Sequence, residues 1–253
     1  KDLVIKIWEI KYLLDGTDES VTVATTRPET LLGDMALAVN PEDERFAHLI
    51  GKNVIIPICK RLIPIVGDDY VDPEFGTGVV KITPGHDFND YELGKRHGLF
   101  MDESMQCHIG DEKEFNPISI LNKAVQIEGV APEKYHGMDR FEARKELLED
   151  LKQDSCLVSQ DEYESTLPYG DRSDQILEPL LTDQWYVDAK TLAKPAIEAV
   201  KSKEIQFVPA NWEKTYFQWM DNIQDWCISR QLWWGHRIPI WYDESNLPFA
   251  GYS

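Results

Sequence analysis

The stretch IKIWEIKYLLDGTDESVTVATT, residues 5–26, decides the fold. Residues 5–14 predict a β-strand, Asp15-Gly16 a turn, and residues 21–26 a second strand that ends at Arg27-Pro28. Outward from this pair, more short apolar runs are bounded by turns: residues 54–58 and 62–66, joined as a hairpin by 59–61, and residues 78–83, ended by Pro84-Gly85. Many short strands with this punctuation indicate a compact, barrel-like sheet.

Helical patterns interrupt these strands. Residues 40–50 begin with a capping asparagine, a proline at the first helical position and acids in the first turn, which predicts a helix that stops at Gly51. Three more helices are expected over residues 86–97, closed by Gly98, over 138–153 and over 188–202. We therefore expect an α+β fold, with a β-barrel-like domain, peripheral helices and a helical C-terminal segment.

Four tryptophans, Trp212, Trp219, Trp226 and Trp233, recur at intervals of seven residues. Heptad spacing places them near one face of a helix, or of helices in sequence. Two interpretations stay open: the stripe is buried against a neighbouring element, or it forms a platform on which nucleic-acid bases stack.

The composition is that of a folded protein with a sizeable core, since the 253 residues are 42% hydrophobic and 11% aromatic. No run approaches the roughly 20 apolar residues of a membrane-spanning helix, and the first ten residues contain no signal-peptide core. The four cysteines are scattered, without the spacing of a zinc ribbon or a redox dithiol. We therefore expect a cytoplasmic protein without a membrane partner.

Acidic residues outnumber basic ones by 45 to 26, which gives a formal net charge of −19. This charge argues against a nucleic-acid-binding module, because phosphate contacts need a cationic surface. The acid is uneven: residues 154–183 hold eight acidic residues and only Arg172 in return. That stretch predicts a solvated face.

The first candidate site is TTRPETLLGD, residues 25–34, where threonines and an arginine follow a predicted strand. Arg27 offers a fixed fork of donors for a phosphate, a carboxylate or a carbonyl. Thr26 and Thr30 carry hydroxyls that both donate and accept, which suits a small polar ligand or a positioned water. Taken alone, the peptide is also consistent with an ordinary strand and turn.

The second candidate site is GTGVVKITPGHDFND, residues 76–90. Lys81 and Thr83 are two residues apart in a strand and therefore point to the same face. Asp87 and Asp90 share one face of the first turns of the following helix, so a cation, a hydroxyl and two carboxylates can converge at this corner. Such carboxylates could hold an ammonium group or polarise a water. For Asp87, simple capping of the helix is the alternative.

No metal is expected at either peptide. His86 and Asp87 are adjacent and diverge on a helix, and the other histidines have no ligand spacing with one another. The sequence also contains no Ser-His-Asp signature, no GxxxxGK[ST] phosphate loop and no GxGxxG.

Together, TTRPETL (25–31), GTG (76–78) and PGHD (84–87) resemble the editing domain of the class I aminoacyl-tRNA synthetases for valine, isoleucine and leucine. The runs DQWYV (183–187) and WCISRQLWWGHRIPIWY (226–242) are similar to the same family. The match is closest to the valine enzymes. Leucine enzymes usually carry Asp at the position of Glu29 and lack the pair formed by Lys81 and Thr83, and isoleucine enzymes typically have Thr in place of Arg27.

The resemblance implies an editing domain over residues 1–170, followed by a return segment over 171–253 that is extended, then helical, and leads back towards the synthetase core. The HIGH-type and KMSKS-type sequences that handle ATP in this family are absent. We therefore expect an excised fragment that activates no amino acid and needs no cofactor, with ATP and Mg²⁺ serving the parent enzyme.

The resemblance also implies a reaction, the hydrolysis of threonine wrongly attached to tRNA(Val). Threonine is nearly isosteric with valine, and the known rejection of threonine by the valine enzymes' hydrophobic pocket is only roughly a hundredfold. By match to the family motif, Asp87 would anchor the substrate's α-ammonium group. Arg27, Thr30 and Thr26 would position the terminal adenosine and the ester. Lys81, Thr83 and Asp90 would contact the threonine side chain or the attacking water.

Two alternatives stay open. The first is a leucine- or isoleucine-type editing domain with another substrate preference. The second is a module that binds the tRNA end or an amino acid without catalysis. For the valine-type editing domain, the partners that the resemblance implies are the 3′ end of tRNA(Val) carrying threonine and the rest of the synthetase chain.

Overall fold

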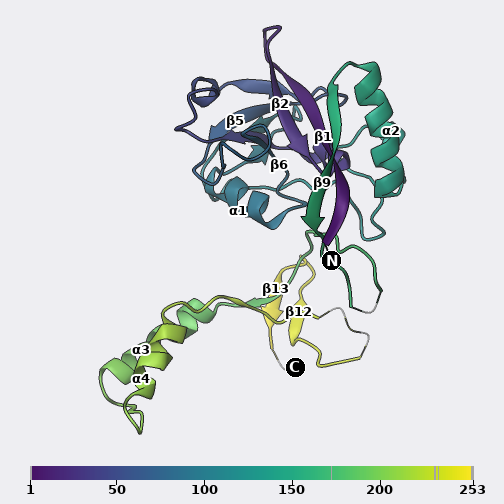
Figure 1. Cartoon of the computed structure of the whole chain (residues 1–253). Helices are drawn as coiled ribbons and strands as arrows, with labels where there is room; N and C mark the ends of the chain where they lie inside the picture. Colours follow the sequence, from purple (N-terminus) through teal and green to yellow (C-terminus); the bar gives the residue numbers. More distant parts are fainter. Residues whose placement is uncertain (1, 172, 231, 233, 252–253) are drawn as a thin grey trace. The chain divides into compact units, whose positions relative to one another are not determined.

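The computed structural model describes residues 2–171, 173–230, 232 and 234–251 (Figure 1). The chain forms two compact units, residues 1–181 and 182–253, which are described separately. The boundary between the units follows Leu181. The functional boundary after residue 170 stays a prediction.

A seven-stranded sheet dominates the first unit, in the order β2-β1-β4-β5-β3-β6, with β9 added to β1. All pairs are antiparallel except β3 with β5. The end strands β2 and β6 also contact each other, so the sheet is a nearly closed barrel and the predicted α+β fold is confirmed. The strands are β1 (Asp2–Leu14), β2 (Ser20–Thr25), β3 (Ala36–Val39), β4 (Asn53–Ile55), β5 (Leu62–Gly67), β6 (Val79–Ile82) and β9 (Leu157–Thr166), beside a small pair, β7 (Phe100–Met101) and β8 (Cys107–His108).

Buried and exposed side chains alternate along β1, and the buried ones form part of the core. Trp8, Ile10, Tyr12 and Leu14 are at most 5% exposed, whereas Lys11 between them is exposed. A period of two is that of a strand with one face on the core. Each large apolar side chain that is fully buried in this way stabilises the fold by roughly 1.5–3 kcal/mol.

The helices expected over residues 86–97 and 138–153 are confirmed as α1 (Phe88–Arg96) and α2 (Arg140–Gln153). Each begins after an aspartate whose side chain accepts backbone N–H bonds of the first turn. On α2, Ala143, Leu147 and Leu151 are buried at four-residue spacing, which packs one face of the helix on the core. Two short 3-10 helices, η1 (Pro28–Gly33) and η3 (Glu133–Tyr135), complete these connections.

The helix expected over residues 40–50 is wrong. This segment forms turns and one short 3-10 helix, η2 (Ala47–Leu49). Asn40 accepts a bond from the backbone N–H of Glu42, and Asp43 accepts one from the N–H of Arg45. These side-chain bonds form local turns that compete with helical hydrogen bonding.

Among its described residues, the second unit contains two helices and two small strand pairs. The helix expected over residues 188–202 is confirmed as α3 (Ala189–Lys201), and α4 (Trp212–Met220) follows it. Strand β10 (Tyr186–Val187) pairs with β11 (Trp226–Cys227), and β12 (Ile240–Tyr242) pairs with β13 (Pro248–Ala250).

The expected tryptophan stripe on one helical face is wrong. Trp212 and Trp219 lie on α4, but the helix ends at Met220 and Trp226 lies in β11. Trp233 lies outside the described residues. The three described side chains are 56%, 76% and 62% exposed, so within this chain they are not packed into a core.

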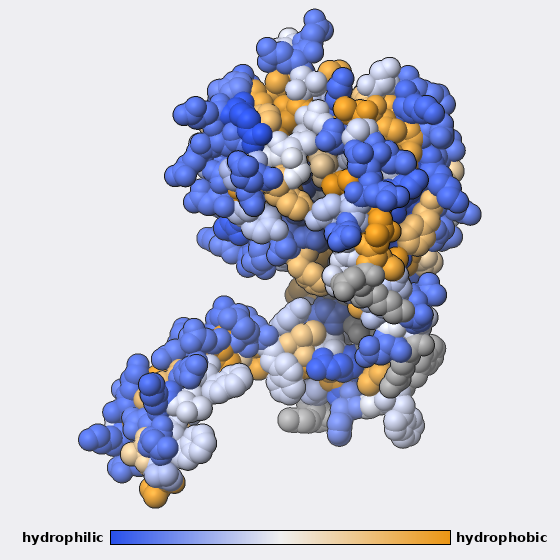
Figure 2. Space-filling model, viewed as in Figure 1, coloured by the Kyte–Doolittle hydropathy of each residue, from blue (hydrophilic) through white to orange (hydrophobic). Residues whose placement is uncertain are grey.

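Hydrophilic side chains cover most of the visible face of the first unit (Figure 2). The acidic stretch largely fits its predicted solvated character, because most side chains of β9 are at least partly exposed. Glu178 is the exception: its side chain is only 10% exposed and pairs with two arginines. Among the described residues, the structure contains no helix with the length and apolar character needed to cross a membrane.

Candidate functional site

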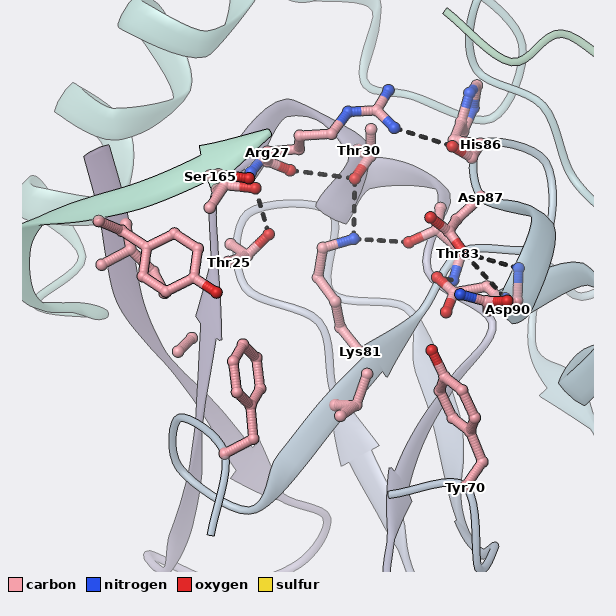
Figure 3. Close-up of a pocket in the computed structure, with 17 residues that line it drawn as sticks. Thr25, Arg27, Thr30, Tyr70, Lys81, Thr83, His86, Asp87, Asp90 and Ser165 are labelled. Carbon is pink, nitrogen blue, oxygen red and sulfur yellow. Dashed lines mark hydrogen bonds between the residues drawn. The ribbon is translucent and has the colours of Figure 1, made fainter. Parts of the chain in front are cut away.

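One pocket of the first unit gathers all the residues that the sequence predicts for a site (Figure 3). Its volume is about 300 Å³, at the lower end of the range for small-molecule sites. The two candidate peptides therefore meet in one cleft, although the roles of their residues stay predictions. The predicted residues in its lining are Thr26, Arg27, Thr30, Lys81, Thr83, Asp87 and Asp90.

Two chain reversals bring these side chains together. After β2 the chain turns into η1, where Pro28 fits the first helical position and Thr30 closes the turn by donating to the Arg27 carbonyl at 3.0 Å. After β6, Pro84-Gly85 redirects the chain into α1. A Cβ at Gly85 would lie 2.0 Å from the Ile118 carbonyl oxygen, so this close approach requires glycine.

The pocket floor is a buried polar network around the Lys81 ammonium group (Figure 3). Lys81 Nζ donates to the hydroxyl of Thr30 at 2.8 Å, to the hydroxyl of Thr83 at 2.6 Å and to Asp34 Oδ1 at 3.1 Å. An ammonium group has three protons, so each of them has a partner within the protein.

Asp34 is a functional candidate that sequence reasoning missed as a site residue. It is fully buried and accepts hydrogen bonds from Lys81, from the hydroxyl of Thr83 at 2.6 Å and from the hydroxyl of Tyr12 at 2.6 Å. Burial raises the pKa of Asp34, while Lys81 and the three donated bonds favour its charged form. A carboxylate placed directly after η1 was the available sequence signal, but its partners become visible only in the fold.

Asp90 faces the same floor from the first turn of α1. Its Oδ2 accepts the backbone N–H of Thr83 at 2.9 Å, and the residue is 9% exposed. Burial raises the pKa of Asp90 to about 7, against the opposing effect of Lys81. Asp90 is therefore a carboxyl group whose charge changes near neutral pH.

Asp87 caps α1, as its alternative interpretation predicted. Its Oδ1 accepts the backbone N–H groups of Asn89 at 2.8 Å and of Asp90 at 3.1 Å. The residue is exposed and also lines the pocket, so capping by one oxygen leaves the other available to a ligand. The two roles are compatible.

Arg27 stands at the pocket edge and is already engaged. Its Nη1 donates to the His86 carbonyl at 2.8 Å, and its Nη2 pairs with Glu178. Glu178 also pairs with Arg140, the first residue of α2. Burial lowers the pKa of Arg27. A ligand anion at this edge must therefore compete with Glu178 for the guanidinium group.

Aromatic side chains also line the pocket, and the sequence analysis did not predict them. Phe75 and Tyr163 line the pocket with their rings edge to face, 6.2 Å apart at 79°, and Tyr70 lines it as well. Phe75 is 57% exposed, so part of its side chain is accessible to a ligand. Tyr163 and Ser165 come from β9, whose pairing with β1 no local sequence signal announces.

His86 is buried and neutral. Burial, together with the positive charges of Arg27 and Lys81, lowers its pKa to about 3. Its Nε2 accepts the backbone N–H of Ile120 at 3.0 Å, so the ring proton is assigned to Nδ1, which has no hydrogen-bond partner among the described residues. The described residues contain no group of three His, Cys, Asp or Glu side chains that could hold a metal ion.

Residues 17–248 match the family model of the tRNA synthetases class I (I, L, M and V). The chain belongs to this family. The resemblance drawn from the two peptides and the later runs is thereby confirmed.

Similar proteins of known sequence are valine–tRNA ligases. The chain is 56% identical over 247 residues to the enzyme of Legionella pneumophila (strain Lens), and 51% identical over 247 residues to that of Coxiella burnetii. Each match covers 98% of this chain and 25% of the relative, so the chain spans about a quarter of the length of these relatives. A solved structure described as GlLeuRS-CP1 aligns with 13% identity and a TM-score of 0.44, covering 62% of this chain and 98% of that one.

Proposed function

We propose that this chain is the editing region of a valine–tRNA ligase and that it hydrolyses the ester of threonyl-tRNA(Val) at the terminal adenosine. The observation that carries the proposal is the convergence of Lys81, two threonine hydroxyls and two carboxylates on one pocket. A pocket of this size fits an amino acid and part of a nucleoside, and its polar floor suits threonine better than valine.

The floor supplies the discrimination. Thr30, Thr83 and Asp90 each have an oxygen that can accept one more hydrogen bond, which a threonine hydroxyl can donate and a valine methyl group cannot. One such hydrogen bond is worth about 0.5–1.5 kcal/mol, and more where the acceptor is charged. This is the discrimination that a hydrophobic synthetic pocket supplies poorly.

The rim holds the rest of the substrate. The second carboxylate oxygen of Asp87, which does not cap α1, would accept a hydrogen bond from the α-ammonium group of the aminoacyl ester. Arg27, with Thr26 beside it, lies where it can bind the ester or the adenosine. The exposed side chain of Phe75 in the pocket lining could stack on the adenine ring.

The reaction needs a water that attacks the ester carbonyl and releases threonine and the ribose hydroxyl of the tRNA. We assign no general base. A water that donates hydrogen bonds to the Thr83 hydroxyl oxygen and to Asp90, helped by the neighbouring ribose hydroxyl of the substrate, would make this attack. No cofactor enters this step, and ATP and Mg²⁺ belong to the parent enzyme's aminoacylation.

The proposed partners are the 3′ end of tRNA(Val) and the rest of the synthetase. The net charge of −19 makes this chain a poor source of tRNA affinity by itself. Cationic surface in the rest of the synthetase would therefore hold the tRNA body and deliver its end to this pocket.

Deacylation assays test the proposal. The chain, and a full-length valine–tRNA ligase that contains it, should release threonine from threonyl-tRNA(Val) much faster than valine from valyl-tRNA(Val). Binding of the charged end without release by either protein would support the binding module instead. Preferential release of another amino acid would support a leucine- or isoleucine-type editing domain.

A further inference from the structure

The hydrogen-bond directions in the pocket floor are fixed by Asp34, which itself does not line the pocket. Its Oδ1 accepts a hydrogen bond from the Thr83 hydroxyl at 2.6 Å and another from the Lys81 ammonium group at 3.1 Å. A carboxylate can only accept, so Thr83 has to be the donor in this contact.

The other protons of Lys81 and the hydroxyl proton of Thr30 also have partners within the protein. Lys81 uses its other two protons to donate hydrogen bonds to the hydroxyl oxygens of Thr30 and Thr83. Thr30 in turn donates its own proton to the Arg27 carbonyl. Each of the two hydroxyl oxygens therefore keeps one free lone pair and no free proton.

A floor of this kind has a chemical preference. A ligand group that carries a proton, such as an alcohol, can donate to Thr30 or Thr83. An apolar group or a bare carbonyl gains no hydrogen bond from these two hydroxyls, because neither has a free proton. The preference depends on the negative charge of Asp34, because that charge sets the direction of the Thr83 bond and balances Lys81.

We propose that Asp34 is a positioning residue that sets the specificity of the pocket for a ligand hydroxyl that donates a proton. It acts through Lys81 and Thr83 and makes no contact with the ligand. This inference rests on the proposed function, in which the ligand is an aminoacyl ester, and names the group of that ester that the floor recognises.

The test uses two esters that differ only in the hydroxyl. A full-length valine–tRNA ligase containing this chain is given tRNA charged with threonine or with 2-aminobutyrate, and kcat/KM is measured for both. The parental protein should favour the threonyl ester by about tenfold or more, the equivalent of one buried hydrogen bond. Asp34→Asn keeps the side-chain volume but removes the charge, and this ratio should fall towards one with little change in KM for the tRNA.

Tyr12→Phe is the matched control. It removes a different hydrogen bond to Asp34 and leaves the bonds from Lys81 and Thr83 in place. Its ratio should stay at the parental value even where its melting temperature falls. A merely structural role for Asp34 predicts that the two variants lose activity in proportion to their stability and keep the ratio.

Each outcome decides the inference. A parental ratio of one, an unchanged ratio in a folded Asp34→Asn protein, or an equal loss in Tyr12→Phe would overturn it. If Asp34→Asn does not fold, Thr83→Val takes its place, and an unchanged ratio there overturns the inference too. If the parental protein hydrolyses neither ester, the proposed function itself has failed, which is a different result.

Discussion

Asp87 joins two roles in a single side chain, and a pair of substitutions separates them. Asp87→Ala removes the cap of α1 and should cost about 0.5–2 kcal/mol of stability. Asp87→Asn keeps a good capping oxygen but loses the charge, so its stability should stay near the parental value. Both variants of a full-length synthetase should accumulate threonyl-tRNA, because neither can hold the α-ammonium group by charge.

Thermal unfolding and deacylation, measured side by side, check this prediction. If Asp87→Asn edits at the parental rate while Asp87→Ala is destabilised, the aspartate is only a cap. The α-ammonium group must then be bound elsewhere in the pocket, with Asp90 the nearest candidate.

Asp90 gives a prediction about pH. Its pKa is raised from 3.8 to about 7 by burial, so the folded state holds its proton more tightly than the unfolded chain. The stability associated with this proton is complete below about pH 4 and is lost as the pH rises through about 7. Asp90→Asn removes that titration, so it should gain stability relative to the parent between pH 5 and pH 8.

Melting temperatures of both proteins at several pH values measure this difference. A constant difference across the range would show that Asp90 titrates normally in the fold. In deacylation, the charged form of Asp90 is the better acceptor for a substrate hydroxyl, so the parental rate should rise with pH around 7.

At the scale of elements, local periodicity in the sequence predicted most of the strands and helices of the first unit. Residues 5–14 and 21–26 became β1 and β2, and the hairpin of β4 and β5 followed from two apolar runs and a turn. The failures have physical causes. Side-chain turns at Asn40 and Asp43 displaced a helix, and the tryptophan period continued past the end of α4.

The same limit applied to the site: residues close together in the sequence could be predicted, and contacts between distant segments could not. The side chains that neighbour each other along β6 and α1, such as Lys81 and Asp90, were found from their spacing. Asp34, Glu178 and Tyr163 were missed, because their roles depend on pairings between segments far apart in the sequence. Strand register and the route of the chain after β9 decide those contacts, and no local pattern encodes them.

Gly85 lies in the turn between β6 and α1, where the Ile118 backbone approaches it closely. Gly85→Ala would place a Cβ 2.0 Å from the Ile118 carbonyl oxygen, and backbone has little room to move there. Overpacking of this kind typically costs about 1–3 kcal/mol and shifts nearby backbone. The variant should therefore lose both stability and deacylation, because the shift displaces Thr83 and Asp87 on either side.

Gly251→Ala is the comparison, since nothing lies within 4 Å of a Cβ at that position and its backbone conformation suits alanine. It should match the parent in thermal unfolding. A Gly85→Ala protein with parental stability and activity would show that the segment at Ile118 yields easily, and that the corner does not depend on glycine.

At the scale of the whole molecule, the two units differ in what stabilises them. The main cluster of buried hydrophobic residues extends from Trp8 to Leu151 and lies entirely in the first unit. In the second unit, the described residues contribute only Ala193 and Val200 to the buried hydrophobic set. Most of the free energy of folding therefore belongs to residues 1–181.

This asymmetry predicts that a shortened chain of residues 1–181 folds on its own. Its melting temperature should lie within about 4 °C of the value for the full chain, since a shift of that size corresponds to a loss of about 1 kcal/mol. It should also keep the pocket, because every residue of the lining lies before residue 166.

A second shortened chain, which ends after residue 170, lacks Glu178. Arg27 and Arg140 then lose the carboxylate that they share, which should lower stability further. Circular dichroism during heating compares the three chains. Equal melting of the two shortened chains would show that Glu178 contributes nothing to the fold, and unfolding of both at ambient temperature would place essential contacts after residue 181.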